Sequence, residues 1–202
     1  MRTIYMVSSA DFRRIKSVVM KGIRSSERPP SFVFEADYKV IAFVEFDTGF
    51  TPNFWKLTRS LALASGDEDV LVLAIEPDAE SYFHKEFGTY GAIRLSINDS
   101  AKTYTEKLEE HPVGWPVDSL KFNSECLVWA SDSGSWIAWG SRGFGFIAIA
   151  FKAGFSTSLV ELSKEAGIDI MEKNRAVSDI IIPSFYDQNA AKTFAAKFIQ
   201  NY

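Results

Sequence analysis

Cysteine and histidine are scarce in this 202-residue sequence, which contains one cysteine, Cys126, and two histidines, His84 and His111. A lone cysteine cannot form an internal disulfide, so the chain is typical of a reducing compartment, and we expect a cytoplasmic protein. The sequence also lacks a G-x-S-x-G turn, an H-E-x-x-H pair, paired C-x-x-C motifs and a phosphate-binding lysine loop. The motifs therefore predict no catalytic residue, no metal ligand and no cofactor.

Long apolar runs are absent as well, because no stretch approaches the roughly 18 residues that suggest a membrane span. We therefore expect no membrane contact.

Positive charge is scarce over most of the chain, whose formal net charge is −4. Residues 1–28 hold seven basic and two acidic side chains, a balance of +5, so residues 29–202 carry −9. An acidic body does not attract nucleic acid, and it favours a basic protein partner.

Apolar and aromatic residues are abundant, at 47% and 14% of the chain, which is ample for a buried core. The sequence shows no internal repeat and no linker long enough to divide it. We predict one α+β domain over residues 1–202, with a mixed, largely antiparallel central sheet flanked by helices. Residues 1–28 are expected to form a basic helical segment that packs on this domain.

Hydrophobic periodicity and capping residues predict the order of the elements. Thr51-Pro52 is a strong helix start, and Val70 to Ile75 form an apolar run that suggests an interior strand covered on both faces. The expected helices are a basic helix capped by Ser8 or Ser9 and helices over 52–65, 76–88, 100–110, 157–166 and 187–202. The expected strands are 31–35, 38–46, 70–75, 92–97, two strands within 127–139, 144–151 and a less regular one that includes 177 and 180–182.

The strongest local signal is an aromatic hairpin within Leu127 to Phe151, which turns at Asp132 to Ser135. If Ser131 pairs with Trp136, Trp129 lies opposite Ala138 and both faces of the hairpin are apolar. We therefore expect the hairpin in the middle of the sheet. Residues 143–148 match the dinucleotide pattern G-x-G-x-x-A, but they alternate as a strand and no helix follows, so a nucleotide site is rejected.

Residues 128–142, with the sequence VWASDSGSWIAWGSR, resemble a hairpin found in several bacterial immunity-protein families that accompany polymorphic or contact-dependent toxins. The resemblance covers only this part of the chain. It implies a protein that binds and neutralises a toxin rather than an enzyme, and it assigns no residue to that contact.

The leading hypothesis is a non-enzymatic binding protein, specifically an immunity protein whose partner is a basic toxin domain. Its candidate contact residues are aromatic and charged side chains near turns and in an acidic cluster: Trp136, Trp139, Arg142, Trp115, Glu76, Asp78 and Glu80. Arg142 is expected to face solvent, and Trp115 lies in an apolar loop over 111–118.

Two other hypotheses stay open at the level of the sequence. The acidic cluster, with His84 and Glu86, follows a predicted central strand, and Glu80 and His84 are spaced to share one helix face. A hydrolase that uses a metal or carboxylate chemistry at Glu76, Asp78 and His84 is therefore the first alternative. The second alternative is a regulatory interaction module that uses the basic first helix.

Overall fold

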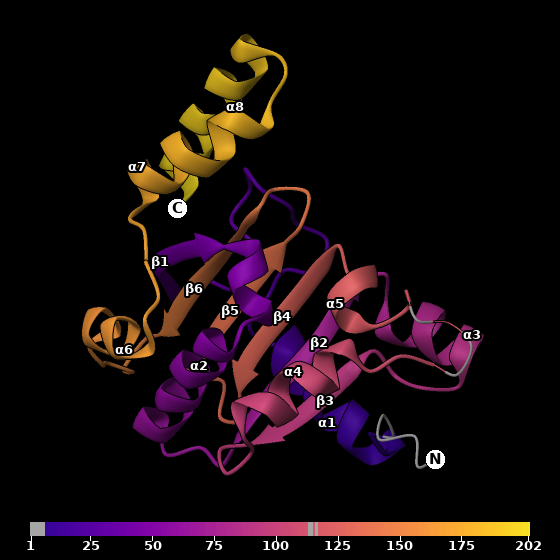
Figure 1. Ribbon diagram of the computed structural model, residues 1–202. Helices are drawn as coiled ribbons and strands as arrows, with labels where there is room; N and C mark the ends of the chain where they lie inside the picture. The colour runs from indigo at the N-terminus through magenta and orange to yellow at the C-terminus, as the bar shows by residue number, and fades with distance from the viewer. Residues whose placement is uncertain (1–6, 113–114, 116) are drawn as a thin grey trace.

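A six-stranded sheet forms the centre of the protein (Figure 1). The computed structural model describes residues 7–112, 115 and 117–202. Among these residues the strand order is β1-β6-β5-β4-β2-β3, and every neighbouring pair is antiparallel. The predicted sheet was largely antiparallel but mixed, whereas the observed sheet is antiparallel throughout. The strands are β1 (Tyr38–Glu45), β2 (Asp69–Glu76), β3 (Ala92–Ser96), β4 (Cys126–Ser131), β5 (Trp136–Ser141) and β6 (Phe146–Lys152).

Helices are the other main element of the described chain, which confirms the predicted α+β class. They are α1 (Ser9–Met20), α2 (Pro52–Ser65), α3 (Lys85–Phe87), α4 (Ala101–Glu109), α5 (Leu120–Asn123), α6 (Leu159–Ala166), α7 (Lys173–Ala176) and α8 (Gln188–Asn201). Shorter 3-10 or π-helical segments cover Phe46–Phe50, Ala79–His84, Val177–Ile181 and Ile182–Ser184.

Side-chain caps fix several helix starts at the residues that the sequence indicated. Ser8 Oγ accepts a hydrogen bond from the Asp11 amide, and Thr51 Oγ1 accepts one from the Phe54 amide. Each cap satisfies one of the amides that the first turn of a helix leaves without a partner. Gly66 ends α2 with φ of 74°, a left-handed conformation that costs glycine little.

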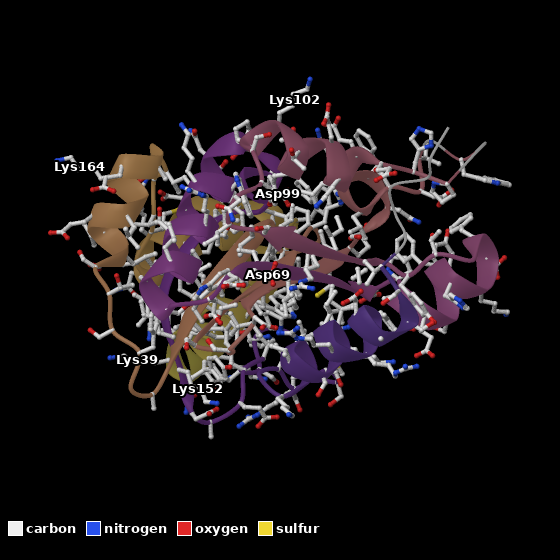
Figure 2. The ribbon with its side chains drawn as sticks, turned by 90° about the horizontal axis from the view of Figure 1, so that it is seen from below. Lys39, Asp69, Asp99, Lys102, Lys152 and Lys164 are labelled. Atoms are coloured by element: carbon white, nitrogen blue, oxygen red, sulfur yellow. The ribbon has the colours of Figure 1, made fainter. Side chains whose placement is uncertain are left out.

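The helices cover the two faces of the sheet. Figure 1 shows α2 and α4 in front of the sheet and α1 behind it, and Figure 2, seen from below, shows the sheet between these two layers. The apolar stripe of α1, formed by Phe12, Ile15 and Val19, is buried. This helix contacts β2, β3 and β4, and its apolar residues belong to the core.

The aromatic hairpin has the predicted register and the predicted central position. Trp129 in β4 lies opposite Ala138 in β5, and β4 and β5 are interior strands of the sheet. Trp129 is buried against the ring of Phe54, and its Nε1 donates a hydrogen bond of 3.1 Å to Tyr104 Oη. The hairpin therefore links the sheet to both α2 and α4.

Two predicted strands are wrong. Residues 31–35 contribute only an isolated bridge between Phe34 and Ile23, outside the sheet. The stretch predicted as a strand at 177–182 is helical, because Val177 and Ile181 share one buried helical face. An Arg175–Asp179 ion pair of 3.2 Å, four residues apart, supports the same helical geometry.

Candidate partner-binding surface

Two tryptophans that the sequence suggested as contact residues are enclosed in the core. The side chains of Trp136 and Trp139 are 0% and 1% exposed. Trp139 lies near Phe146, with 6.3 Å between ring centroids. Because both strands of the hairpin are covered by helices, the rings near its turns are buried like those at its centre. Neither tryptophan is placed to contact a partner, which corrects the prediction.

Arg142 was predicted to face solvent, but it is half-buried. Its Nη2 donates a 2.6 Å hydrogen bond to the Lys121 carbonyl, and its Nε donates a 3.3 Å bond to the Ser124 carbonyl. Its guanidinium also lies 5.0 Å from the centroid of the Phe46 ring. Arg142 therefore holds the end of α5 against the β5–β6 turn, and its donors are directed into the protein.

The acidic cluster is neutralised by basic residues from the start of the chain. Glu76 Oε2 accepts a hydrogen bond of 3.2 Å from Arg28, and Glu80 Oε2 accepts one of 2.8 Å from Lys16. All four side chains are partly exposed, so these ion pairs are exchangeable contacts of modest stability. The basic partner that this cluster favours is, in the folded chain, its own amino-terminal segment.

Asp78 and His84 have separate local roles. One Asp78 oxygen accepts hydrogen bonds from the amides of Glu80 and Ser81, as a helix cap. Partial burial opposes its ionisation, but these hydrogen bonds and the nearby Lys16 outweigh that effect and lower its pKa. The ring of His84 stacks on Tyr90, with 4.3 Å between centroids.

A hydrolytic site would require Glu76, Asp78 and His84 to converge on one hollow, whereas Glu76 pairs with Arg28 and His84 stacks on Tyr90. A cavity beside α1 is lined by Asp78 but by neither of the other two residues. Within the described part of the chain, no group of three His, Cys, Asp or Glu side chains is placed to hold a metal ion. Burial raises the pKa of the Cys126 thiol to about 12, so this cysteine is not an activated nucleophile.

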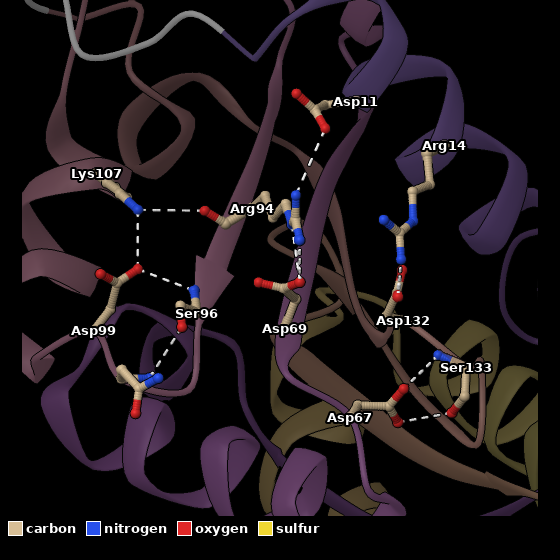
Figure 3. Close-up of polar contacts among 11 residues, drawn as sticks. Asp11, Arg14, Asp67, Asp69, Arg94, Ser96, Asp99, Lys107, Asp132 and Ser133 are labelled. Carbon is tan, nitrogen blue, oxygen red and sulfur yellow. Dashed lines mark hydrogen bonds and ion pairs between the residues drawn. The ribbon is translucent and has the colours of Figure 1, made fainter.

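A network of alternating charges joins α1 to the sheet (Figure 3). Arg14 of α1 contacts Asp132 in the hairpin turn. Arg94 of β3 donates hydrogen bonds of 2.9 and 2.5 Å to Asp69 of β2, and its Nη1 lies 3.7 Å from Asp11 of α1. The hydrogen bonds to Asp69 are the main cause of the raised pKa of Arg94. These contacts use much of the charge of α1 within the protein.

The hairpin turn between β4 and β5 is also held by the carboxylate of Asp67. Asp67 accepts hydrogen bonds of 2.7 Å from both the amide and the hydroxyl of Ser133, as Figure 3 shows. Ser131 Oγ accepts a further bond of 2.9 Å from the Ser135 amide. The polar groups at this turn therefore have partners within the protein, and the turn is not an open contact site.

Large apolar side chains are exposed elsewhere, in the segment that joins α4 to α5 and in α5. Trp115, Val117 and Phe122 are 58%, 67% and 58% exposed, and we call these three residues the 115–122 surface. Trp115 was predicted from the apolar content of its loop, of which residues 113, 114 and 116 lie outside the described residues. Val117 and Phe122 are not among the residues predicted from the sequence, although Ser119, which caps α5, marks a helix start three residues before Phe122.

Hydrogen bonds beneath the 115–122 surface fix its position. Asp118 is 8% exposed, and its Oδ1 accepts bonds of 3.1 Å from Tyr82 Oη and 2.8 Å from Asn123 Nδ2. Trp115 also lies beside Phe87 of α3, with 6.3 Å between ring centroids. The exposed side chains therefore lie over a hydrogen-bonded network that ties the Ala79–His84 segment to α5, a preorganised support of the kind that contact residues need.

Comparison with protein-family models, with curated proteins and with solved structures found no match. Among the described residues, no helix is both long enough and apolar enough to cross a membrane.

Proposed function

We propose that this protein acts by binding another protein, and that the 115–122 surface is its main contact. The observation that supports this proposal is the exposure of Trp115, Val117 and Phe122, each more than half exposed on a hydrogen-bonded support. Exposed apolar patches of this kind mark interaction sites, and tryptophan is enriched among residues that dominate binding energy. The acidic cluster of Glu76, Asp78 and Glu80 is a weaker candidate, because residues 76–86 contain no exposed large apolar side chain.

The charge around this surface favours a basic partner. Residues 106–125 contain five carboxylates and two lysines, a formal balance of −3, and four of these carboxylates, all except Asp118, are not buried. An excess of carboxylates close in sequence to an apolar contact favours association with a basic surface over an acidic one. A basic toxin domain fits this description. The hairpin resemblance is the reason to propose a toxin-neutralising, immunity-type role.

The test is co-expression of this chain with the product of each neighbouring gene, followed by size-exclusion chromatography and calorimetry of any complex. We expect one product to form a stoichiometric complex. Trp115→Ala and Phe122→Ala should each weaken that complex by about tenfold or more, because truncating a central aromatic residue commonly costs about 2 kcal/mol.

Tyr186→Ala provides a matched control, since Tyr186 is a fully exposed aromatic residue outside the 115–122 surface. This variant should bind like the unaltered protein. The proposed contact is wrong if Trp115→Ala and Phe122→Ala also bind normally, and the proposed immunity role is wrong if no neighbouring product forms a complex.

A further inference from the structure

A small cavity lies between α1 and β2, away from the 115–122 surface. Its volume is about 220 Å³. Met20 of α1 and Leu73 and Ile75 of β2 contribute apolar wall, and Lys16 and Asp78 contribute charged groups. Ligand pockets for drug-sized molecules range over about 300–1,000 Å³, so this cavity suits a smaller metabolite.

Two cationic groups are held at the cavity with exchangeable partners. Arg28 Nη1 donates 2.9 Å hydrogen bonds to the carbonyls of Ser25 and Glu27, which fix the guanidinium at the cavity wall. Its Nη2 and the Lys16 ammonium contact carboxylates that are themselves 57% and 55% exposed, those of Glu76 and Glu80. A ligand carboxylate can replace such exposed partners at little cost, because exposed ion pairs stabilise a fold only slightly.

Asp78 supplies the opposite charge at the same cavity. Its pKa is lowered, although partial burial opposes ionisation, because the Ser81 and Glu80 amides and Lys16 stabilise the carboxylate. The site therefore offers ionised groups of both signs beside an apolar wall. A purely anionic ligand would approach Asp78 unfavourably, and a purely cationic ligand would approach Arg28 and Lys16 unfavourably.

We propose that this cavity binds a free aliphatic α-amino acid. The ligand carboxylate pairs with Arg28 and Lys16, the ammonium pairs with Asp78, and the side chain packs against Met20, Leu73 and Ile75. A zwitterion satisfies charges of both signs without adding net charge, and an aliphatic side chain of this size fits the apolar wall. This inference is independent of the proposed protein contact, and it is tested on the purified chain alone.

The experiment is isothermal titration calorimetry with L-leucine and three analogues: 4-methylpentanoate, which lacks the ammonium, 3-methylbutylamine, which lacks the carboxylate, and glycine, which lacks the side chain. We expect one leucine to bind per chain. Each analogue should bind about tenfold more weakly or worse, because each leaves a charged or apolar part of the site unmatched. These ligand comparisons need no protein variant, so a folding defect cannot obscure them.

Two variants assign the charges. Asp78→Asn keeps a helix-capping oxygen but removes the charge, so it should abolish the preference for leucine over 4-methylpentanoate. Arg28→Met should reduce the preference for leucine over 3-methylbutylamine, whereas Arg13→Met, an exposed position of α1 outside the cavity, should change nothing. The proposal is overturned if leucine does not bind at millimolar concentration, or if any analogue binds as tightly as leucine.

Discussion

Replacement of Arg142 by methionine separates a structural role from a partner-contacting role. The methionine side chain keeps much of the length and apolar volume of the arginine stem but has no donors. It therefore removes the hydrogen bonds to the carbonyls of Lys121 and Ser124 and the contact with the Phe46 ring. If Arg142 faced a partner, the same change would weaken binding and leave the free energy of unfolding nearly unchanged.

The geometry gives the size of the expected effect. Hydrogen bonds from a charged donor contribute about 1.5–3 kcal/mol each, and a cation–π contact at an exposed site contributes about 0.5–1 kcal/mol. The bond to Ser124 is long, at 3.3 Å, and the side chain is only half-buried, so water replaces part of what is lost. We therefore expect Arg142→Met to lower the free energy of unfolding by about 3 kcal/mol, and Arg142→Lys by about half as much, because lysine lacks the planar fork.

Urea denaturation followed by tryptophan fluorescence measures this change. The midpoint should fall while the slope stays constant, because the amount of surface exposed on unfolding is unchanged. Lys192→Met, at an exposed position of α8, is the matched control and should leave the midpoint unchanged. A loss smaller than about 0.5 kcal/mol for Arg142→Met, in the range of an ordinary surface substitution, would refute the structural role.

Three further predictions concern buried groups. Tyr104→Phe should cost about 2–4 kcal/mol in urea denaturation, because it removes the buried hydrogen-bond partner of both Trp129 Nε1 and the Gly49 carbonyl, and a loss below about 1 kcal/mol would contradict this. Cys126 is 2% exposed with a pKa raised to about 12 by burial, so a thiol reagent at pH 8 should label it only after unfolding, and fast labelling of the folded protein would contradict its burial. Burial, with Asp37 nearby, raises the pKa of Tyr38 from 10.0 to about 12. The stability that neutral Tyr38 contributes should therefore be present below pH 10 and be lost as the pH rises towards 12. In alkaline unfolding titrations Tyr38→Phe should make this loss of stability shallower, and an unchanged slope would contradict the assignment.

Local signals in the sequence were sufficient for much of the fold. The Thr51 cap and the proline that follows it predict the start of α2 correctly, because capping depends on residues adjacent in the chain. The hairpin register is predicted correctly for the same reason, since the turn at Asp132 to Ser135 fixes which residues face each other.

Packing between distant segments explains the errors. Trp136 and Trp139 lie beside turns, a position that suggests exposure, but both are enclosed in the core, where Trp139 lies beside Phe146 of β6. Similarly, the apolar residues Val177 and Ile181 fit a strand by composition, whereas the structure buries them on one face of a helical segment. In each case burial depends on the tertiary structure, which a local pattern does not contain.

The candidate site was predicted only in part, and for the same reason. The apolar loop identified Trp115, but Phe122 is made prominent by α5, a short helix held by Arg142 and capped by Ser119. No periodicity is visible in four helical residues. Its exposure follows from tertiary contacts at both of its ends, not from its own sequence.

The charge asymmetry also has a different meaning in the folded protein. A balance of +5 in residues 1–28 and −9 in the rest suggested a basic partner for the whole acidic body. Arg14, Lys16 and Arg28 instead pair with Asp132, Glu80 and Glu76, so the first segment neutralises the acidic side chains that it covers. Residues 106–125, which include Trp115 and Phe122, hold five carboxylates and two lysines, and these ion pairs of the first segment do not reach them.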